Sequence, residues 1–319
     1  MTLNYNRLFS ATEELAFDDL RAYRRGDAAE PGTYIYDEGE AQPGRIELAV
    51  NLALAAGRPL LVSGVPGTGK SSLARSVAHR LKWRYYEHVV SSRTQARDLL
   101  WSFDAVKRLS DAQVAKAGEE KTALQPDAAY ITPGALWWAF DRQSAATRGA
   151  QGLAPLKDPS PLDSARAVVL VDEIDKADPD VPNDLLVPLG SLYFDVEELR
   201  VKASEPPLVI ITTNGERDLP RAFLRRCVTL ELKAPDDDRL WRIARAHFPH
   251  EPSDDVLKRI RASYRAVQER QEDASLPQAS LAEFLDAVAA AKALGATPAD
   301  GTLWGLVEQL TLDKTSDGG

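Results

Sequence analysis

The feature that most constrains this sequence is a glycine-rich segment that reads Gly64-Val65-Pro66-Gly67-Thr68-Gly69-Lys70-Ser71. It satisfies the pattern G-x-x-x-x-G-K-[ST] in full. An apolar run at 59–63 precedes it, and a helical pattern with Leu73, Val77 and Leu81 on one face follows it. Glycines let successive N–H groups turn toward a phosphate, and the N-terminus of the helix adds partial positive charge. The alternative is a chance glycine-rich turn, and the correct strand–loop–helix context argues against it.

The pattern assigns roles to particular residues. Lys70 is expected to reach the β- and γ-phosphates of a nucleotide, and Ser71 to bind Mg²⁺. The predicted cofactors are therefore ATP and Mg²⁺. The nucleotide-binding residues expected from the segment are Gly64, Val65, Pro66, Gly67, Thr68, Gly69, Lys70, Ser71 and Ser72.

Apolar runs and helical segments alternate through the first two thirds of the chain. Further strands are expected at 85–90, 167–171, 208–213 and 228–232. Strands separated by helices predict an α/β fold, in which a parallel sheet is sandwiched by helices. The stretch 142–166 has no clear period, and we expect it to form a long, mobile surface loop.

After Pro235 the strand signals stop and helical spacing takes over. Helices are expected at 236–247, 253–270, 280–294 and 303–312, and Ser280 with Glu283 has capping-box spacing. The predicted division is a lead-in at 1–44, an α/β domain at 45–235, a smaller all-helical domain at 236–314 and a frayed tail at 315–319. The lead-in is expected to hold a helix at 12–25 followed by turns.

Composition excludes several classes of protein. The formal net charge of -9 disfavours general binding to nucleic acid. No apolar run approaches the ~18–20 residues that span a bilayer, so no membrane insertion is expected. Cys227 is the only cysteine, which excludes an intramolecular disulfide. We therefore expect a cytoplasmic protein.

A second group of residues with chemical potential follows the expected strand at 167–171. This apolar strand ends in Asp172 and Glu173. A central parallel strand would deliver Asp172 to the Mg²⁺ shell and Glu173 to the water that attacks the γ-phosphate. An acidic turn after a strand is the alternative reading, and it loses weight because the phosphate loop is present.

The segment 171–177, Val-Asp-Glu-Ile-Asp-Lys-Ala, resembles the Walker B region of AAA+ ATPases, and in particular of their MoxR-like branch. The strand at 208–213 leads to Asn214, which matches the family's sensor 1 residue. The segment 219–227 is similar to the arginine-finger segment, with the finger on Arg226 and Arg225 as a second candidate. Solvated arginines are the alternative for both. The resemblance covers residues 45–294 and implies catalytic roles for Glu173, Asn214 and Arg226 or Arg225.

This resemblance also implies how such a protein works. AAA+ proteins form homo-oligomeric rings, here expected to be hexameric, in which a finger completes the neighbour's site. The implied work is ATP-driven remodelling or activation of a protein client, for which MoxR-like proteins use von Willebrand factor A-domain partners. A hairpin at 191–199 would carry Tyr193 or Phe194 at its tip to touch a substrate, or pack those rings on the sheet. Trp101, near a pore-loop position, is interpreted as core.

One position departs from the family. MoxR-like proteins often carry a sensor 2 arginine where this chain has Gln278. Two rival functions remain at this stage: a nucleotide-gated scaffold with slow hydrolysis, which Gln278 favours, and a motor acting on nucleic acid. Measurements of steady-state turnover and of DNA-stimulated turnover would separate these rivals from a protein-remodelling ATPase.

Overall fold

The computed structural model describes residues 34–36, 44–116, 125–249, 252–273 and 278–313. Its contacts divide the chain into two compact units. The first holds Glu47–Ser63 and Ala74–Glu231; the second holds Gly64–Leu73, Leu232–Gly319 and the described residues before Glu47. The expected helix at 12–25 and the tail at 315–319 lie outside the described residues, and the domain boundary at residue 235 stays a prediction.

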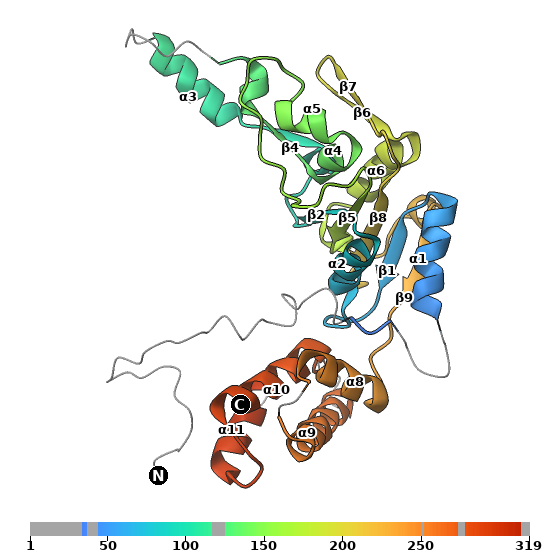
Figure 1. Ribbon diagram of the computed structural model, residues 1–319, viewed down its shortest axis with the longest axis vertical. Coiled ribbons are helices and arrows are strands. Elements are labelled where there is room, and N and C mark those ends of the chain that lie inside the picture. Colours follow the sequence, from blue (N-terminus) through green and yellow to red (C-terminus); the bar gives the residue numbers. More distant parts are fainter. Residues whose placement is uncertain (1–33, 37–43, 117–124, 250–251, 274–277, 314–319) are drawn as a thin grey trace. The chain divides into compact units, whose positions relative to one another are not determined.

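A five-stranded parallel sheet forms the centre of the first unit (Figure 1). Its strands run in the order β2-β5-β8-β1-β9, and each predicted strand is confirmed to within a residue or so at its ends. The two most apolar strands are β5 and β8; β8 is buried throughout, and β5 is buried up to its last residue. The bounds are β1 Leu60–Ser63, β2 Arg84–Val89, β5 Ala167–Asp172, β8 Leu208–Thr213 and β9 Val228–Glu231.

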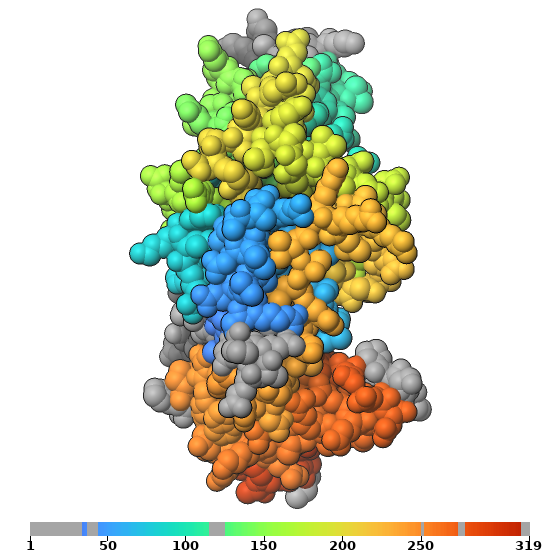
Figure 2. Space-filling model, turned by 90° about the vertical axis from the view of Figure 1, so that its right-hand side faces the viewer, coloured from blue at the N-terminus to red at the C-terminus, as the bar shows by residue number. Residues whose placement is uncertain are grey.

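Helices flank this sheet, as continuous apolar strands require. They are α1 (Arg45–Ala56), α2 (Lys70–Leu81), α4 (Ala135–Phe140), α6 (Asp180–Ser191) and α7 (Arg221–Leu224). α1 is followed by Gly57 with φ +61°, the left-handed conformation that favours glycine at a helix end. Figure 2 shows α1, in blue, on the surface beside the segment that contains α7 and β9. In the described residues, no helix is long and apolar enough to cross a bilayer.

The chain between β2 and β5 builds a subdomain that the sequence did not predict. A short antiparallel pair, β3 (Trp101–Phe103) and β4 (Ile131–Pro133), frames α3 (Ala105–Lys116), which projects away from the sheet (Figure 1). The short 3-10 turns η4 (Ala96–Leu99) and η5 (Asp127–Tyr130) precede β3 and β4 respectively. Trp101 is half-buried and packs against the core, with Arg97 over its ring at 5.2 Å.

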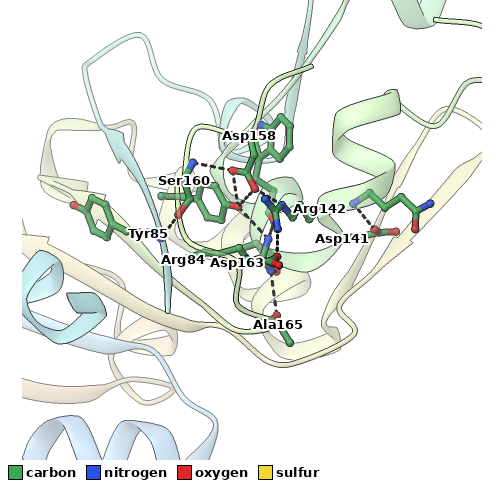
Figure 3. Close-up of polar contacts among 12 residues, drawn as sticks. Arg84, Tyr85, Asp141, Arg142, Asp158, Ser160, Asp163 and Ala165 are labelled. Atoms are coloured by element: carbon green, nitrogen blue, oxygen red, sulfur yellow. Dashed lines mark hydrogen bonds and ion pairs between the residues drawn. The ribbon is translucent and has the colours of Figure 1, made fainter. Parts of the chain in front are cut away.

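The prediction of a loop over 142–166 is wrong for its first part, because the helix α5 (Arg142–Thr147) lies there and is capped by Asp141. The remainder is irregular but is fastened by buried polar groups (Figure 3). Asp158 accepts hydrogen bonds from the Tyr86 hydroxyl and forms an ion pair with Arg142 at 2.5 Å. Arg84, only 3% exposed, donates to Tyr86 Oη at 3.0 Å and to the carbonyl of residue 165 at 3.1 Å. Long-range pairing of this kind leaves no periodic signal in the sequence.

The predicted hairpin after α6 exists, but its aromatic residues are not at its tip. It consists of β6 (Tyr193–Val196) and β7 (Leu199–Lys202), so the turn falls on residues 197–198. Phe194 is buried against Trp137 and Phe140, which confirms packing on the core rather than substrate contact. Tyr193 is partly exposed and lies 4.6 Å beneath the Arg200 guanidinium.

Four helices of the second unit share a separate apolar core. The helices predicted after residue 235 are confirmed as α8 (Asp237–His247), α9 (Asp254–Asp273), α10 (Leu281–Leu294) and α11 (Gly301–Thr311). The predicted capping box is present, because Ser280 and Glu283 exchange side-chain-to-backbone hydrogen bonds at the start of α10. The fully buried side chains of this core include Leu240, Leu257, Phe284 and Val288.

Candidate active site

The glycine-rich loop connects β1 to α2 and folds around a lysine. Lys70, in the first turn of α2, is 6% exposed and donates from Nζ to the carbonyls of Gly64 at 2.8 Å and Val65 at 3.0 Å. Thr68 donates from its hydroxyl to the same Val65 carbonyl at 3.0 Å. The loop therefore holds a buried ammonium group at a helix N-terminus, where anions are favoured.

Two glycines of the loop have no room for a side chain. Gly64 has φ +148°, and a Cβ there would lie 2.5 Å from the Leu232 carbonyl oxygen. Gly67 has φ +78°, and a Cβ there would lie 2.5 Å from the Ser280 Cβ. The loop thus needs bare backbone, which is what close approach to a phosphate also requires. Together with Lys70, this cradle fits the phosphates of a nucleotide.

Two neighbouring strands of the sheet bring the candidate acidic residues together. Asp172 is the last residue of β5, and Thr212 lies on the adjacent strand β8. The Thr212 hydroxyl donates to Asp172 Oδ1 at 2.5 Å and accepts from the Glu173 backbone N–H at 2.8 Å. A single buried hydroxyl therefore fixes one carboxylate and the backbone of the next residue.

Glu173 leaves the strand in an unusual backbone conformation. Its φ of 60° and ψ of 50° place it in the left-handed region, which a residue with a Cβ adopts at a cost. Its carboxylate is held on both sides: Asn214 Nδ2 donates to Oε1 at 3.1 Å, and Lys176 Nζ donates to Oε2 at 2.5 Å. The structure thus joins Glu173 and Asn214, two residues that the sequence predicted separately.

The loop that carries Asn214 is anchored by a third carboxylate. Asp175, in the short 3-10 turn η6 (Ile174–Lys176), is 3% exposed. Its Oδ2 accepts from the backbone N–H groups of Asn214 at 3.1 Å and Glu216 at 3.0 Å. The position of the Asn214 amide is therefore set by the same turn that contains Lys176.

The two candidate finger residues lie on the surface of the first unit. Arg225 and Arg226 follow α7, precede β9 and are both exposed. Within the described residues, no carboxylate forms an ion pair with either guanidinium. The Arg225 carbonyl accepts a hydrogen bond from Arg58 at 3.4 Å, and Arg225 is exposed. Both side chains are accessible to another molecule.

Gln278, the expected sensor 2 position, lies close in sequence to Ser280, the residue of the second unit that approaches the glycine-rich loop. Gln278 is exposed and stands two residues before Ser280, the N-cap of α10 that approaches Gly67. Arg245, another lid arginine, is engaged within its own unit: it donates to the carbonyls of residues 248 and 252, pairs with Asp254 and lies over the Trp241 ring.

Sequence reasoning missed three polar residues of this site. Thr212, Asp175 and Lys176 all belong to segments that were recognised, yet none carried an individual signal. Threonine is common in strands because it is β-branched, and acidic and basic residues are common after them. Only the pairing of β5 with β8 brings Thr212 to Asp172, and Asp175 to the backbone of Asn214.

A strand–glycine loop–helix unit, together with a second strand of the same sheet that ends in Asp172 and is followed by Glu173, defines a P-loop nucleoside triphosphatase. The family model for the AAA domain (dynein-related subfamily) matches residues 59–227, which is more than half of the chain. The chain therefore belongs to the AAA family and is an ATP-hydrolysing enzyme of the P-loop class. Its match ends at Cys227, directly after Arg225 and Arg226.

Two solved structures resemble the chain more distantly. One is a Cytophaga hutchinsonii protein provisionally described as an ATPase, with 14% identity, a TM-score of 0.41, and coverage of 88% of this chain and 83% of that one. The other is a mutant of RuvB from Thermotoga maritima, with 14% identity, a TM-score of 0.39, and coverage of 77% and 67%. The search of curated proteins gives no significant match.

Proposed function

We propose that this chain is a Mg²⁺-dependent, MoxR-like AAA+ ATPase that works as a homo-oligomeric ring to remodel or activate a protein client. The observation that carries this proposal is the hydrogen bond of 3.1 Å between Asn214 Nδ2 and Glu173 Oε1. It unites the two polar side chains that a water-activating site needs, beyond the ends of adjacent buried strands. A solvated acidic turn would not require this contact.

In the proposed mechanism each residue has a distinct task. Lys70 and the bare backbone of the loop bind the β- and γ-phosphates. Ser71 and Asp172 would hold Mg²⁺, which when bound supplies charge neutralisation on those phosphates. Glu173 polarises the attacking water, and Asn214 fixes the direction of its carboxylate.

The assembly part of the proposal is supported by one face of the first unit. Arg225 and Arg226 are exposed and follow α7, and the segment that contains α7 and β9 lies beside α1 (Figure 2). α1 exposes the apolar side chains of Leu48 (59% exposed) and Leu52 (50% exposed). Exposed apolar side chains next to guanidinium groups suit a subunit interface that delivers an arginine to a neighbouring phosphate. A hexameric ring and a client with a von Willebrand factor A domain complete the proposal.

The test compares two variants with the wild-type protein. Glu173→Gln keeps the shape of the side chain and should bind ATP normally while losing most hydrolysis. Lys70→Ala should instead weaken nucleotide binding, measured by titration calorimetry. A Glu173→Gln protein that hydrolyses ATP at the wild-type rate would remove Glu173 from the mechanism.

The client class is tested with the same variant. Glu173→Gln, loaded with ATP, should retain a von Willebrand factor A-domain protein that the wild type releases as it turns over. Turnover stimulated by DNA, with a strong dependence on salt, would instead favour the motor on nucleic acid.

A further inference from the structure

Lys176 contacts the carboxylate that the proposed mechanism uses to polarise water. Its ammonium lies 2.5 Å from Glu173 Oε2, three residues away across the η6 turn. Both side chains are only partly covered, at 40% and 29% exposure, so this ion pair is open to solvent. The hydrogen bond to Glu173 raises the pKa of Lys176, which keeps the ammonium charged throughout the neutral range.

The contact matters because Glu173 has two oxygens and both are engaged. Asn214 holds Oε1, so Oε2 is the oxygen left for a water molecule once Lys176 moves away. While the Lys176 contact persists, the ammonium occupies the oxygen of Glu173 that would otherwise face the attacking water.

We propose that Lys176 is a positioning residue that restrains Glu173, and that hydrolysis requires the ammonium to leave Oε2. This inference rests on the proposed role of Glu173 in polarising water. The structure offers the ammonium another anion: Glu216, which follows Asn214, is the next charge after Glu173 that raises the pKa of Lys176. Glu216 is exposed, and its backbone N–H donates to Asp175 of the same turn at 3.0 Å.

The exposure of the ion pair between Lys176 and Glu173 sets the expected size of its effect on the rate. Exposed ion pairs are weak, so breaking this one can change the rate by about two- to fivefold and not by orders of magnitude. Lys176→Met, which keeps the length of the side chain without its charge, should therefore raise kcat by about two- to fivefold. KM for ATP should not change, because Lys176 is not placed on the nucleotide.

The experiment measures steady-state ATP hydrolysis by the full chain with five variants, of which Lys176→Met is the first. Lys176→Arg keeps a cation and should stay near the wild-type rate. Lys202→Met, at an exposed lysine of β7, is the matched control and should not change kcat. Glu173→Gln and the double variant with Lys176→Met should be equally inactive, because the gain must act through Glu173. Thermal melting confirms that the variants are folded.

The outcomes separate this inference from the function on which it rests. If Glu173→Gln is inactive but Lys176→Met has an unchanged or lower kcat, the restraint is wrong and the role of Glu173 stands. A gain that persists in the double variant also overturns the restraint, since it does not pass through Glu173. Wild-type hydrolysis by Glu173→Gln alone defeats the proposed function, whatever Lys176 does.

Discussion

Thr212 donates a hydrogen bond of 2.5 Å from its hydroxyl to Asp172 Oδ1. This bond links β5 and β8, the two most apolar strands of the sheet, near their C-terminal ends. The same hydroxyl oxygen accepts from the Glu173 backbone N–H at 2.8 Å. Because Thr212 is fully buried, removal of its hydroxyl would leave the Glu173 N–H without its partner.

Thr212→Val, which has nearly the same shape, should therefore reduce both activity and stability. Loss of the bond to a charged group predicts a fall in kcat of about tenfold or more, and loss of the buried acceptor a cost of about 1–3 kcal/mol. Activity assays and chemical denaturation measure the two effects. Thr212→Ser restores the hydroxyl and should recover most of the rate. Wild-type activity in Thr212→Val would show that this hydroxyl does not position Asp172 or Glu173.

Local patterns predicted the parts of the site that are contiguous in sequence. The loop from Gly64 to Ser71 has a fixed spacing because its backbone must wrap one anion, and the apolar strand before Asp172 is recognisable by itself. The link from Thr212 to Asp172 could not be predicted, because it depends on β8 lying next to β5 across 40 residues of chain. The order of strands in a sheet depends on how the strands pack, and the composition of a single strand does not reveal it.

The same reasoning explains the errors elsewhere. The short strands β3 and β4 have three residues each, too few for an alternating pattern to stand out. The turn residues 197–198 are acidic and carry no turn signature, so the sequence left two alternatives open for Tyr193 and Phe194, the tip of the hairpin or packing on the sheet. The burial of Phe194 against Trp137 is a contact between segments that are distant in sequence.

A second prediction concerns Arg226, the arginine that is proposed to act across a subunit boundary. Arg226→Ala should bind ATP normally but hydrolyse it about 10³-fold more slowly or worse, because the finger stabilises charge on the transferred phosphoryl group. Mixing this variant with Lys70→Ala should restore part of the activity, since some sites then combine an intact loop with an intact finger. The activity of the mixtures, titrated against each parent, is the measurement.

Arg225→Ala is the matched comparison, because Arg225 is also exposed and adjacent in sequence. If Arg225→Ala is the inactive variant, the finger is assigned to Arg225 instead of Arg226, and the mixing experiment is repeated with Arg225→Ala. If mixed oligomers form and no mixture of either variant with Lys70→Ala exceeds its parents, the trans arrangement is wrong. A monomer that hydrolyses ATP at full rate would also exclude it.

A third prediction follows from the half-buried histidine on β2. Burial lowers the pKa of His88 below its ordinary value of 6.5, although the charge of Asp98 opposes this shift. Below pH 6.5 the unfolded chain therefore binds a proton more readily than the folded chain, so acidification destabilises the protein between that pH and the lower pKa of the folded state. His88→Gln should lose less thermal stability than the wild type between pH 7.5 and pH 5.5. Equal losses in the two proteins would contradict this account.

The last prediction concerns nucleotide discrimination without a sensor 2 arginine. An arginine on the γ-phosphate gives ATP a charge-assisted hydrogen bond that ADP cannot form, worth about 1.5–3 kcal/mol. Gln278 carries no charge, and Arg245 is already held by Asp254 and two carbonyls at the end of α8. A single subunit, without a neighbour's Arg226, should therefore bind ATP and ADP with similar affinity in titration calorimetry.

Gln278→Arg tests whether this position faces the nucleotide. Ser280 lies close to the glycine-rich loop at Gly67, so an arginine two residues earlier starts near the loop that is proposed to bind the phosphates. The variant should raise the preference of the monomer for ATP over ADP by about tenfold or more, because the new bond carries a full charge. Gln278→Lys has the same charge without the planar fork and should give a smaller gain. If the wild-type monomer already prefers ATP about a hundredfold and loses that preference in Arg245→Ala or Lys292→Ala, a different lid residue performs the task and the assignment to position 278 is wrong.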